Sequence, residues 1–324
     1  MRYGVPYQGS KNRIAAALAD AIPHTGLDNF YDLFAGGCAM THVMLERGWY
    51  KRYFANDLGG FGVRLFTDAI SGKFRNERRW ITLEEFHAKK NIDSYISLVW
   101  SFGNNCHNYL YSAEVEPWKK ALHYARVCGD SSFMEAFGIH TDGSREDIRA
   151  HHAEYKRKYI SWYLNVYGGA DTARLQRLQR LQGLQGLQGL ERLQGLEGLQ
   201  RLQRLQGLQT SFQSYEAVEI LPNSIVYCDP PYRGTYGYEG VGKFDHDRFY
   251  RWCERQEALV LISEYAMPPD RFVCVWERDR MMTFSAGINR KSVERLYVPR
   301  RQAKRYYELM RKPRWVQLEL FENS

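Results

Sequence analysis

Apolar residues recur along the chain in two spacings that predict different elements. Residues 12–22 and 38–47 carry apolar side chains at helical spacing, which predicts a helix in each segment. Short apolar runs bounded by Gly, Pro, Asn or Asp predict buried strands. The predicted strands are residues 29–34, 52–55, 224–228, 259–263, 273–276 and 294–298. Because helices alternate with strands in this order, the pattern indicates a parallel sheet with crossover connections.

The alternation stops between residues 58 and 169. This segment is rich in aromatic residues, Asn, Lys and Arg, and it contains Ser101-Phe102-Gly103-Asn104-Asn105 and Lys156-Arg157-Lys158. We interpret it as an inserted, mainly helical module within an α/β core. The expected organisation is a discontinuous core (residues 1–58 and 210–312), an insertion (59–173), a repeat (174–209) and a tail (313–324).

The repeat has leucine at every third position from Leu175 to Leu208. An α-helix turns by about 100° per residue, so a three-residue period drifts by about 60° per step and holds no apolar stripe. Glycines within the repeat weaken a helix by about 1 kcal/mol each. The segment is poor in acidic and aromatic groups, which predicts a tandem insert without a catalytic role.

Composition narrows the class of protein. The 324 residues carry a formal charge of +8, which favours a polyanionic partner, and 44% are hydrophobic, which excludes global disorder. The six cysteines show no close pairs at metal-ligand spacing, and no N-terminal apolar stretch resembles a signal. We therefore expect reduced thiols in the cytoplasm of a bacterial or phage-infected cell. No apolar run approaches the ~18 residues of a membrane span.

A glycine turn follows the first predicted strand in Asp32-Leu33-Phe34-Ala35-Gly36-Gly37. Such a turn lets the backbone approach a ligand closely at the carboxyl edge of a parallel sheet. Met40 occupies the third glycine position of the dinucleotide fingerprint, so the turn alone is either a cofactor-binding turn or a tight connection. Asp57 ends the next strand, where it can accept hydrogen bonds from a ribose or cap a helix.

Asp229-Pro230-Pro231-Tyr232 after the strand at 224–228 is the most specific motif. The two prolines fix φ and remove two donors, which leaves a rigid turn with free carbonyl groups. A carboxylate and a prolyl carbonyl at this point can accept both hydrogens of an amino group and direct its lone pair toward an electrophile. The Tyr232 ring offers a surface for base stacking. A structural Pro-Pro loop is the alternative interpretation.

The order of these motifs resembles the Dam-like class of N6-adenine-specific DNA methyltransferases of phages and restriction–modification systems. That class has an aromatic-x-Gly-x-Lys start, a glycine turn, an acidic strand end, a target-recognition insertion and Asp-Pro-Pro-Tyr. The matching segments here are Tyr7-Gln8-Gly9-Ser10-Lys11, Phe34-Ala35-Gly36-Gly37, Asn56-Asp57 and Asp229-Pro230-Pro231-Tyr232. Residues 262–265 and 294–297 also resemble its later strands.

The resemblance implies a Rossmann-like, mostly parallel α/β core that binds S-adenosylmethionine, with residues 59–173 reading double-stranded DNA. The implied cofactor-binding residues are Tyr7, Lys11, Asp57 and Asp229, and the glycine-turn segment adds Asp32, Phe34 and Gly36. The expected catalytic residues are Asp229, Pro230, Pro231 and Tyr232. No metal ion is expected.

The expected reaction is direct methyl transfer to the amino nitrogen of an adenine that has left the duplex, where this group is paired and stacked. Methylation of the cytosine amino nitrogen uses the same hydrogen-bonding logic and is one alternative. A catalytically silent DNA-binding relative is another. The motif order favours the adenine enzyme over the first alternative, and the presence of Lys11 and Asp229 favours it over the second.

The C-terminal tail carries a motif that this chemistry does not require. Gln317-Leu318-Glu319-Leu320-Phe321 resembles the short peptide by which bacterial replication and repair proteins dock on the sliding clamp. A glutamine amide and apolar anchors on a chain end suit such a pocket, although a terminal strand or helix packed on its own core is the alternative. The triplet Asp245-His246-Asp247 predicts a helix start rather than a metal site.

Overall fold

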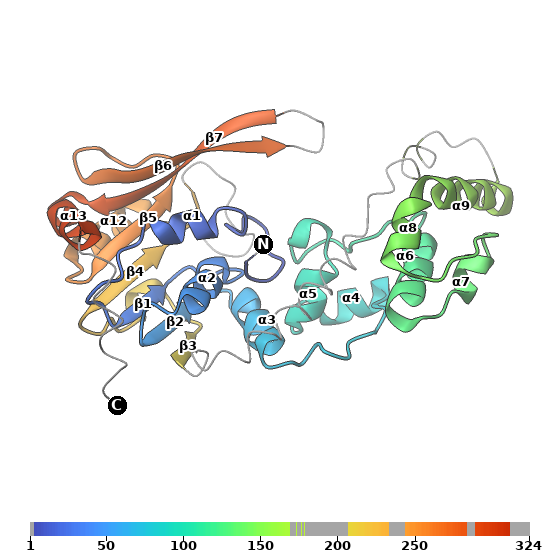
Figure 1. Ribbon diagram of the computed structural model, residues 1–324, viewed down its shortest axis with the longest axis horizontal. Helices are drawn as coiled ribbons and strands as arrows, with labels where there is room; N and C mark the ends of the chain where they lie inside the picture. Colours follow the sequence, from blue (N-terminus) through green and yellow to red (C-terminus); the bar gives the residue numbers. More distant parts are fainter. Residues whose placement is uncertain are drawn as a thin grey trace. The chain divides into compact units, whose positions relative to one another are not determined.

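A computed structural model of the chain describes residues 3–168, 173, 176, 178, 207–232, 244–283 and 289–311. The chain forms two compact units. Figure 1 shows the chain coloured by residue number from the N-terminus to the C-terminus. The first unit consists of Met1–Val5, Gly9–Thr67 and Leu199–Ser324. The second consists of Pro6–Gln8 and Asp68–Gly198.

The first unit contains a seven-stranded sheet in the order β3-β2-β1-β4-β5-β7-β6. Its strands are β1 (Asn29–Asp32), β2 (Arg52–Asn56), β3 (Leu208–Ser211), β4 (Ser224–Cys228), β5 (Leu259–Glu264), β6 (Phe272–Thr283) and β7 (Asn289–Pro299). The pairings from β3 to β5 are parallel, whereas β7 is antiparallel to both β5 and β6. The sheet differs from the common doubly wound order because the antiparallel strand β7 lies between β5 and the edge strand β6. The predicted Rossmann-like, mostly parallel α/β core is confirmed.

The central strands are buried along their whole length, as expected for parallel strands covered on both faces. Tyr31 of β1 stacks on Phe54 of β2 with ring centroids 4.1 Å apart, beside Val226 and Val260 of the neighbouring strands. Polar side chains at the strand starts form hydrogen bonds with neighbouring loops. Asn29 Nδ2, for example, donates to the Pro222 carbonyl at 2.8 Å.

The helices of the first unit cover this sheet (Figure 1). They are α1 (Ala15–Asp20), α2 (Ala39–Arg47), α3 (Phe61–Ile70, which runs into the second unit), α12 (His246–Arg255) and α13 (Ala303–Arg311). The predicted helix start at the Asp-His-Asp triplet is confirmed. Asp245 is the N-cap of α12, because its Oδ1 accepts a hydrogen bond from the Arg248 amide at 2.9 Å.

The second unit is mainly helical, as predicted. Its helices are α4 (Leu83–Lys89), α5 (Ser94–Val99), α6 (Glu116–His123), α7 (Ser132–Glu135), α8 (Arg145–Ala150) and α9 (His152–Tyr167). Side chains of Thr82, Asp93 and Ser144 cap three of them. Its core is aromatic and centres on Trp118, Phe137 and Tyr159. No helix in the described ranges is long and apolar enough to cross a membrane.

The structure changes the picture of the leucine repeat at both of its ends. Leu178 is fully buried in the core of the second unit, and β3 begins at Leu208, which pairs with Tyr53 of β2. β3 thus begins two residues before the core segment that the sequence predicts to start at residue 210. The start of β3 could not be recognised in the sequence, because its first residues continue the leucine repeat. β3 is also a partly exposed edge strand, so it lacks the apolar run of a buried strand. Most of the repeat, the tail from residue 312 and the motif at 317–321 lie outside the described residues.

Candidate active site

The chain reverses its direction of travel across the sheet between β1 and β4. These two strands are neighbours, with Asp32 opposite Tyr227, and the amide of Leu33 donates to the Tyr227 carbonyl at 3.0 Å. In doubly wound sheets, ligands bind outside the carboxyl ends of the strands at such a switch point. The glycine turn after β1 and the Asp-Pro-Pro-Tyr segment after β4 therefore lie at the same edge.

The glycine turn is held by close backbone contacts from two directions. The Val5 amide donates to the Gly37 carbonyl at 2.8 Å, and a Cβ on Gly4 would lie 2.1 Å from the same oxygen. At the start of α3, a Cβ on Gly62 would lie 1.9 Å from the Gly36 carbonyl oxygen. Gly4 and Gly62 therefore permit an approach that a larger residue would block. Sequence reasoning missed both, because an isolated glycine has no distinctive local pattern.

Asp57, at the end of β2, joins the glycine turn to α3. Its Oδ2 accepts from the Gly36 amide at 3.0 Å, and its Oδ1 accepts from the amides of Gly59 and Gly60 at 3.0 and 3.1 Å. Both glycines precede α3, so these hydrogen bonds close the turn before the helix and do not cap it. A carboxylate has about four acceptor positions, so this arrangement leaves room for a ribose hydroxyl, which stays a prediction.

Asn56 is a second residue of this edge that the sequence did not single out for a role. Its side chain is 1% exposed and bridges the ends of three strands. Nδ2 donates to the carbonyls of Leu33 and Gln213 at 3.1 and 3.0 Å, and Oδ1 accepts from Ser211 Oγ at 2.8 Å. Asn56 therefore fixes the spacing of the β1, β2 and β3 tips.

Asp32 is buried at the end of β1, with 1% exposure. Its Oδ2 accepts from the Thr41 amide at 3.2 Å and from Thr41 Oγ1 at 2.8 Å, while Oδ1 has no hydrogen-bond partner among the described residues. Burial raises the pKa of Asp32 to about 7, although the Thr41 hydrogen bonds act in the opposite direction. The unsatisfied oxygen is costly unless a ligand or water contacts it.

A charged network surrounds the Asp-Pro-Pro-Tyr segment. Lys11 Nζ lies 3.0 Å from Asp229 Oδ1, 3.8 Å from Glu294 Oε2 and 4.4 Å from the centroid of the Tyr232 ring. Tyr232 donates its hydroxyl proton to Glu294 Oε2 at 3.0 Å and lies 2.9 Å from Ser263 Oγ. The structure thus brings together Lys11, Asp229 and Tyr232, three residues to which the sequence assigned roles, and places Ser263 and Glu294 beside them.

The network leaves the Asp229 carboxyl group with a raised pKa. Burial is the largest cause, the Lys11 ammonium opposes it, and the nearby Glu294 carboxylate adds to the rise. Together with Asp32 and Asp57, the edge therefore contains four carboxyl groups and the Lys11 ammonium. Such a charge distribution favours a ligand with a net positive charge.

Comparison with protein families identifies the family of the chain that carries this site. The D12 class of N6 adenine-specific DNA methyltransferases matches residues 7–255. The chain belongs to this family. The matched range contains the N-terminal Tyr-Gln-Gly-Ser-Lys segment, the glycine turn, Asp57 and the Asp-Pro-Pro-Tyr segment. No individually curated protein matches the chain.

Membership makes the protein an enzyme that methylates adenine in DNA, and the predicted resemblance to the adenine-specific class is confirmed. The family implies S-adenosylmethionine as the methyl donor and DNA as the substrate. In the described part of the chain, no group of three His, Cys, Asp or Glu side chains is placed to hold a metal ion. The Rossmann-like sheet is thus the core of a methyltransferase.

Two further predicted residues have different surroundings in this methyltransferase. Phe34 packs among the aromatic rings of Tyr215, Phe244 and Phe249, with centroid distances of 5.4, 5.8 and 5.6 Å. Its observed contacts are those of a core residue next to the glycine turn. Tyr7 is half-buried and belongs to the second unit, so the structure does not place it at this edge.

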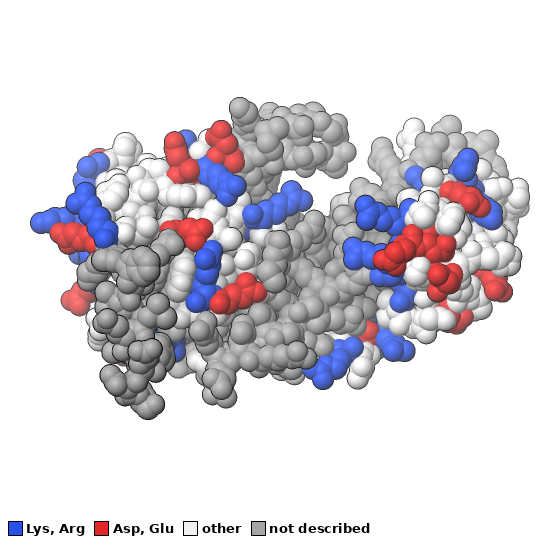
Figure 2. Space-filling view, in the orientation of Figure 1, with Lys and Arg blue, Asp and Glu red and all other residues white. Residues whose placement is uncertain are grey.

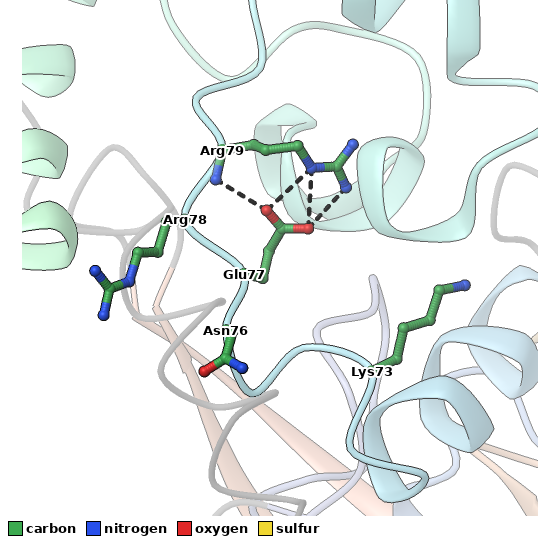
Figure 3. A pocket seen from close by; sticks show the side chains of 5 residues that line it. All are labelled: Lys73, Asn76, Glu77, Arg78 and Arg79. Carbon is green, nitrogen blue, oxygen red and sulfur yellow. Dashed lines mark hydrogen bonds and ion pairs between the residues drawn. The ribbon is translucent and has the colours of Figure 1, made fainter.

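The second unit carries an open surface depression after α3, lined by Lys73, Asn76, Glu77, Arg78 and Arg79 (Figure 3). Arg79 is bound to the Glu77 carboxylate through several hydrogen bonds, the shortest 2.7 Å, and Lys73 lies 2.6 Å from Asp68 Oδ2. These charges are satisfied within the unit. In the view of Figure 2, Lys and Arg are interspersed with Asp and Glu over the helical unit.

Proposed function

We propose that this methyltransferase transfers the methyl group of S-adenosylmethionine to N6 of an adenine flipped out of double-stranded DNA at a specific site. The observation that carries the proposal is the meeting of Lys11, Asp229 and Tyr232 at the β1–β4 switch point. A carboxylate, a prolyl carbonyl and an aromatic ring at one rigid turn match the hydrogen-bonding edge and the face of an adenine.

The residues at the carboxyl edge fit S-adenosylmethionine. The donor carries more positive than negative charge, and it would meet four carboxyl groups here. The unsatisfied Asp32 Oδ1 suits its ammonium group, the tightly packed Gly36 turn suits close backbone approach, and Asp57 suits its ribose. When bound, the donor supplies an electrophilic methyl group on a positively charged sulfur.

In the proposed reaction, the Asp229 carboxylate and the Pro230 carbonyl accept the two N6 hydrogens and thereby orient the nitrogen lone pair. The Tyr232 ring stacks on the base, with Lys11 4.4 Å from its centroid. N6 forms a bond to the methyl carbon as the carbon–sulfur bond breaks, and N6 then loses one proton. Because the pKa of Asp229 is raised, its carboxylate is a suitable acceptor for that proton.

Base flipping follows from the position of N6 inside the paired stack. We assign sequence reading to the insertion at residues 59–173, most of which lies in the helical unit. The place of action would be the cytoplasm of a bacterial or phage-infected cell. Sliding-clamp binding by residues 317–321 stays a prediction from the sequence.

The test is incubation with isotopically labelled S-adenosylmethionine and unmethylated genomic DNA, followed by digestion and nucleoside analysis. We expect label in N6-methyladenine and none in reactions with Asp229→Ala. Label in N4-methylcytosine, or an absence of label from a folded protein that binds DNA, would contradict the proposal.

A further inference from the structure

Glu294 lies on β7, beyond the residues that match the family, and its side chain is almost completely buried at 1% exposure. A carboxylate is costly to bury unless it is paired and hydrogen-bonded. Glu294 meets both conditions in the network of the Asp-Pro-Pro-Tyr segment. It accepts from the Tyr232 hydroxyl at 3.0 Å and lies 3.8 Å from Lys11 Nζ.

The hydroxyl of Tyr232 is fixed from two strands. A tyrosine has one O–H proton, and Tyr232 donates it to Glu294 Oε2. The contact of 2.9 Å with Ser263 Oγ on β5 must then be one in which Ser263 donates. The edge of Tyr232 also meets the Tyr265 ring, with centroids 4.4 Å apart at 83°. Glu294 thus sets the direction of the ring that is proposed to carry the base.

Glu294 also divides the charge of Lys11 between two carboxylates. Lys11 Nζ lies 3.0 Å from Asp229 and 3.8 Å from Glu294, so neither carboxylate has the ammonium to itself. Asp229 therefore keeps more of its capacity as a hydrogen-bond acceptor than it would in an isolated ion pair with Lys11. An amino group that approaches Asp229 benefits from this remaining capacity.

We propose that Glu294 is a positioning residue for methyl transfer, which holds the Tyr232 ring through its hydroxyl and shares Lys11 with Asp229. The inference rests on the proposed function, because it assigns the base to Tyr232 and the amino group to Asp229. Glu294 touches neither donor nor base in this assignment. It acts through Tyr232 and Lys11.

The charges around Asp229 shift its pKa in opposite directions. Glu294 raises it by repulsion, whereas the Lys11 ammonium lowers it. The other titratable groups near Asp229 are Tyr232, Asp32 of β1, and Tyr227 and Cys228 of β4. Transfer that requires the Asp229 carboxylate falls as pH drops through its pKa. Removing the Glu294 charge therefore moves the acid limb to lower pH, whereas removing the Tyr232 hydroxyl breaks the contact that holds the ring and should slow transfer.

The experiment compares Glu294→Ala, Glu294→Gln and Tyr232→Phe by single-turnover methylation between about pH 5 and 8, together with cofactor affinity. Glu308→Ala and Glu308→Gln are the controls, because Glu308 is 60% exposed on α13 in an ion pair with Lys304. We expect Glu294→Ala to slow transfer by about ten- to a hundredfold with cofactor affinity within about twofold of wild type. Glu294→Gln should recover most of the rate, since its amide oxygen still accepts from Tyr232, and its acid limb should move to lower pH.

Equal rates for Glu294→Ala and Glu308→Ala would overturn the inference, as would a Glu294→Gln acid limb at the wild-type position. If Glu294→Ala does not fold, the direction of the acid limb in Glu294→Gln decides. Failure of the proposed function has a different signature: the wild-type protein itself would form no N6-methyladenine, whatever the variants do.

Discussion

The carboxyl edge of the sheet and the core of the helical unit differ in the side chains that they bury. At the edge, charged groups lie close together, and Asp32 Oδ1 lacks a hydrogen-bond partner among the described residues. The helical core is mostly aromatic and aliphatic, although the unit also buries Lys119, whose pKa is lowered by burial to about 8. Two of its tyrosine hydroxyls donate to the backbone. Tyr159 donates to the Glu114 carbonyl at 2.6 Å, and Tyr155 to that of His140 at 3.1 Å.

The two regions therefore contribute differently to activity and to stability. Charges that are not fully neutralised at the edge cost stability but can act on a ligand, as is common at catalytic sites. Aromatic packing in the helical core stabilises the unit. A change of charge at the edge should therefore affect activity before stability, and a change of volume in the helical core should do the reverse.

The largest expected effect is that of Asp229→Asn. The amide keeps the shape of the side chain but presents N–H groups to an amino group that needs acceptors, so transfer should fall by about a thousandfold. Lys11 retains Glu294 as a partner, so the protein should stay folded. Single-turnover methylation and thermal unfolding measure the two quantities. Retention of more than about a tenth of the wild-type rate would contradict the role of Asp229.

Trp118→Ala tests the other region. Trp118 is completely buried between Phe137 and Tyr159, and its truncation should lower the free energy of unfolding of the helical unit by about 3–5 kcal/mol. Cofactor affinity should change little, because the proposed cofactor residues other than Tyr7 lie in the first unit. Denaturant unfolding and cofactor titration check both expectations, with Phe133→Ala, 40% exposed, as the control. If Trp118→Ala lowers cofactor affinity as well as stability, the proposed difference between the two regions does not hold.

The chemical motifs could be predicted from the sequence because their signals are local. Asp229 to Tyr232 and the Gly36 turn are each recognisable within a few residues, and β4 was predicted at its observed limits, Ser224–Cys228. Glu294 and Asn56 could not be assigned roles in this way. Their partners lie far away in the chain, and a Glu or Asn near a strand end has many structural uses. β3 was missed because its first residues continue the leucine repeat.

A smaller effect, dependent on pH, is expected at Asp32. In the unfolded chain this carboxyl ionises near pH 3.8, but in the folded protein its pKa is about 7. Between these values the folded state holds a proton that the unfolded state has lost, so raising the pH destabilises the fold by a few kcal/mol in total. Above about pH 7 both states are ionised and this dependence ends.

Asp32→Asn should therefore make the fall in unfolding free energy between about pH 4 and 7 smaller by a few kcal/mol. Urea unfolding of wild type and variant across this range measures it. Asp68→Asn is the matched control, because Asp68 pairs with Lys73 on the surface. If the two variants have the same pH profile, Asp32 does not hold a proton in the folded protein.

The smallest effect is expected from shortening the leucine repeat between its two anchored ends. Removing residues 183–203 keeps Leu178 in the helical core and Leu208 in β3, so methylation and cofactor affinity should stay within about twofold of wild type. A longer deletion that joins Ala173 to Thr210 removes both anchors and the first two residues of β3. This second protein should unfold at a lower denaturant concentration, because β2 loses its pairing with Leu208 and Gln209. If the short deletion alone abolishes cofactor binding in a folded protein, the middle of the repeat contributes to the site, and the separation between the two regions fails.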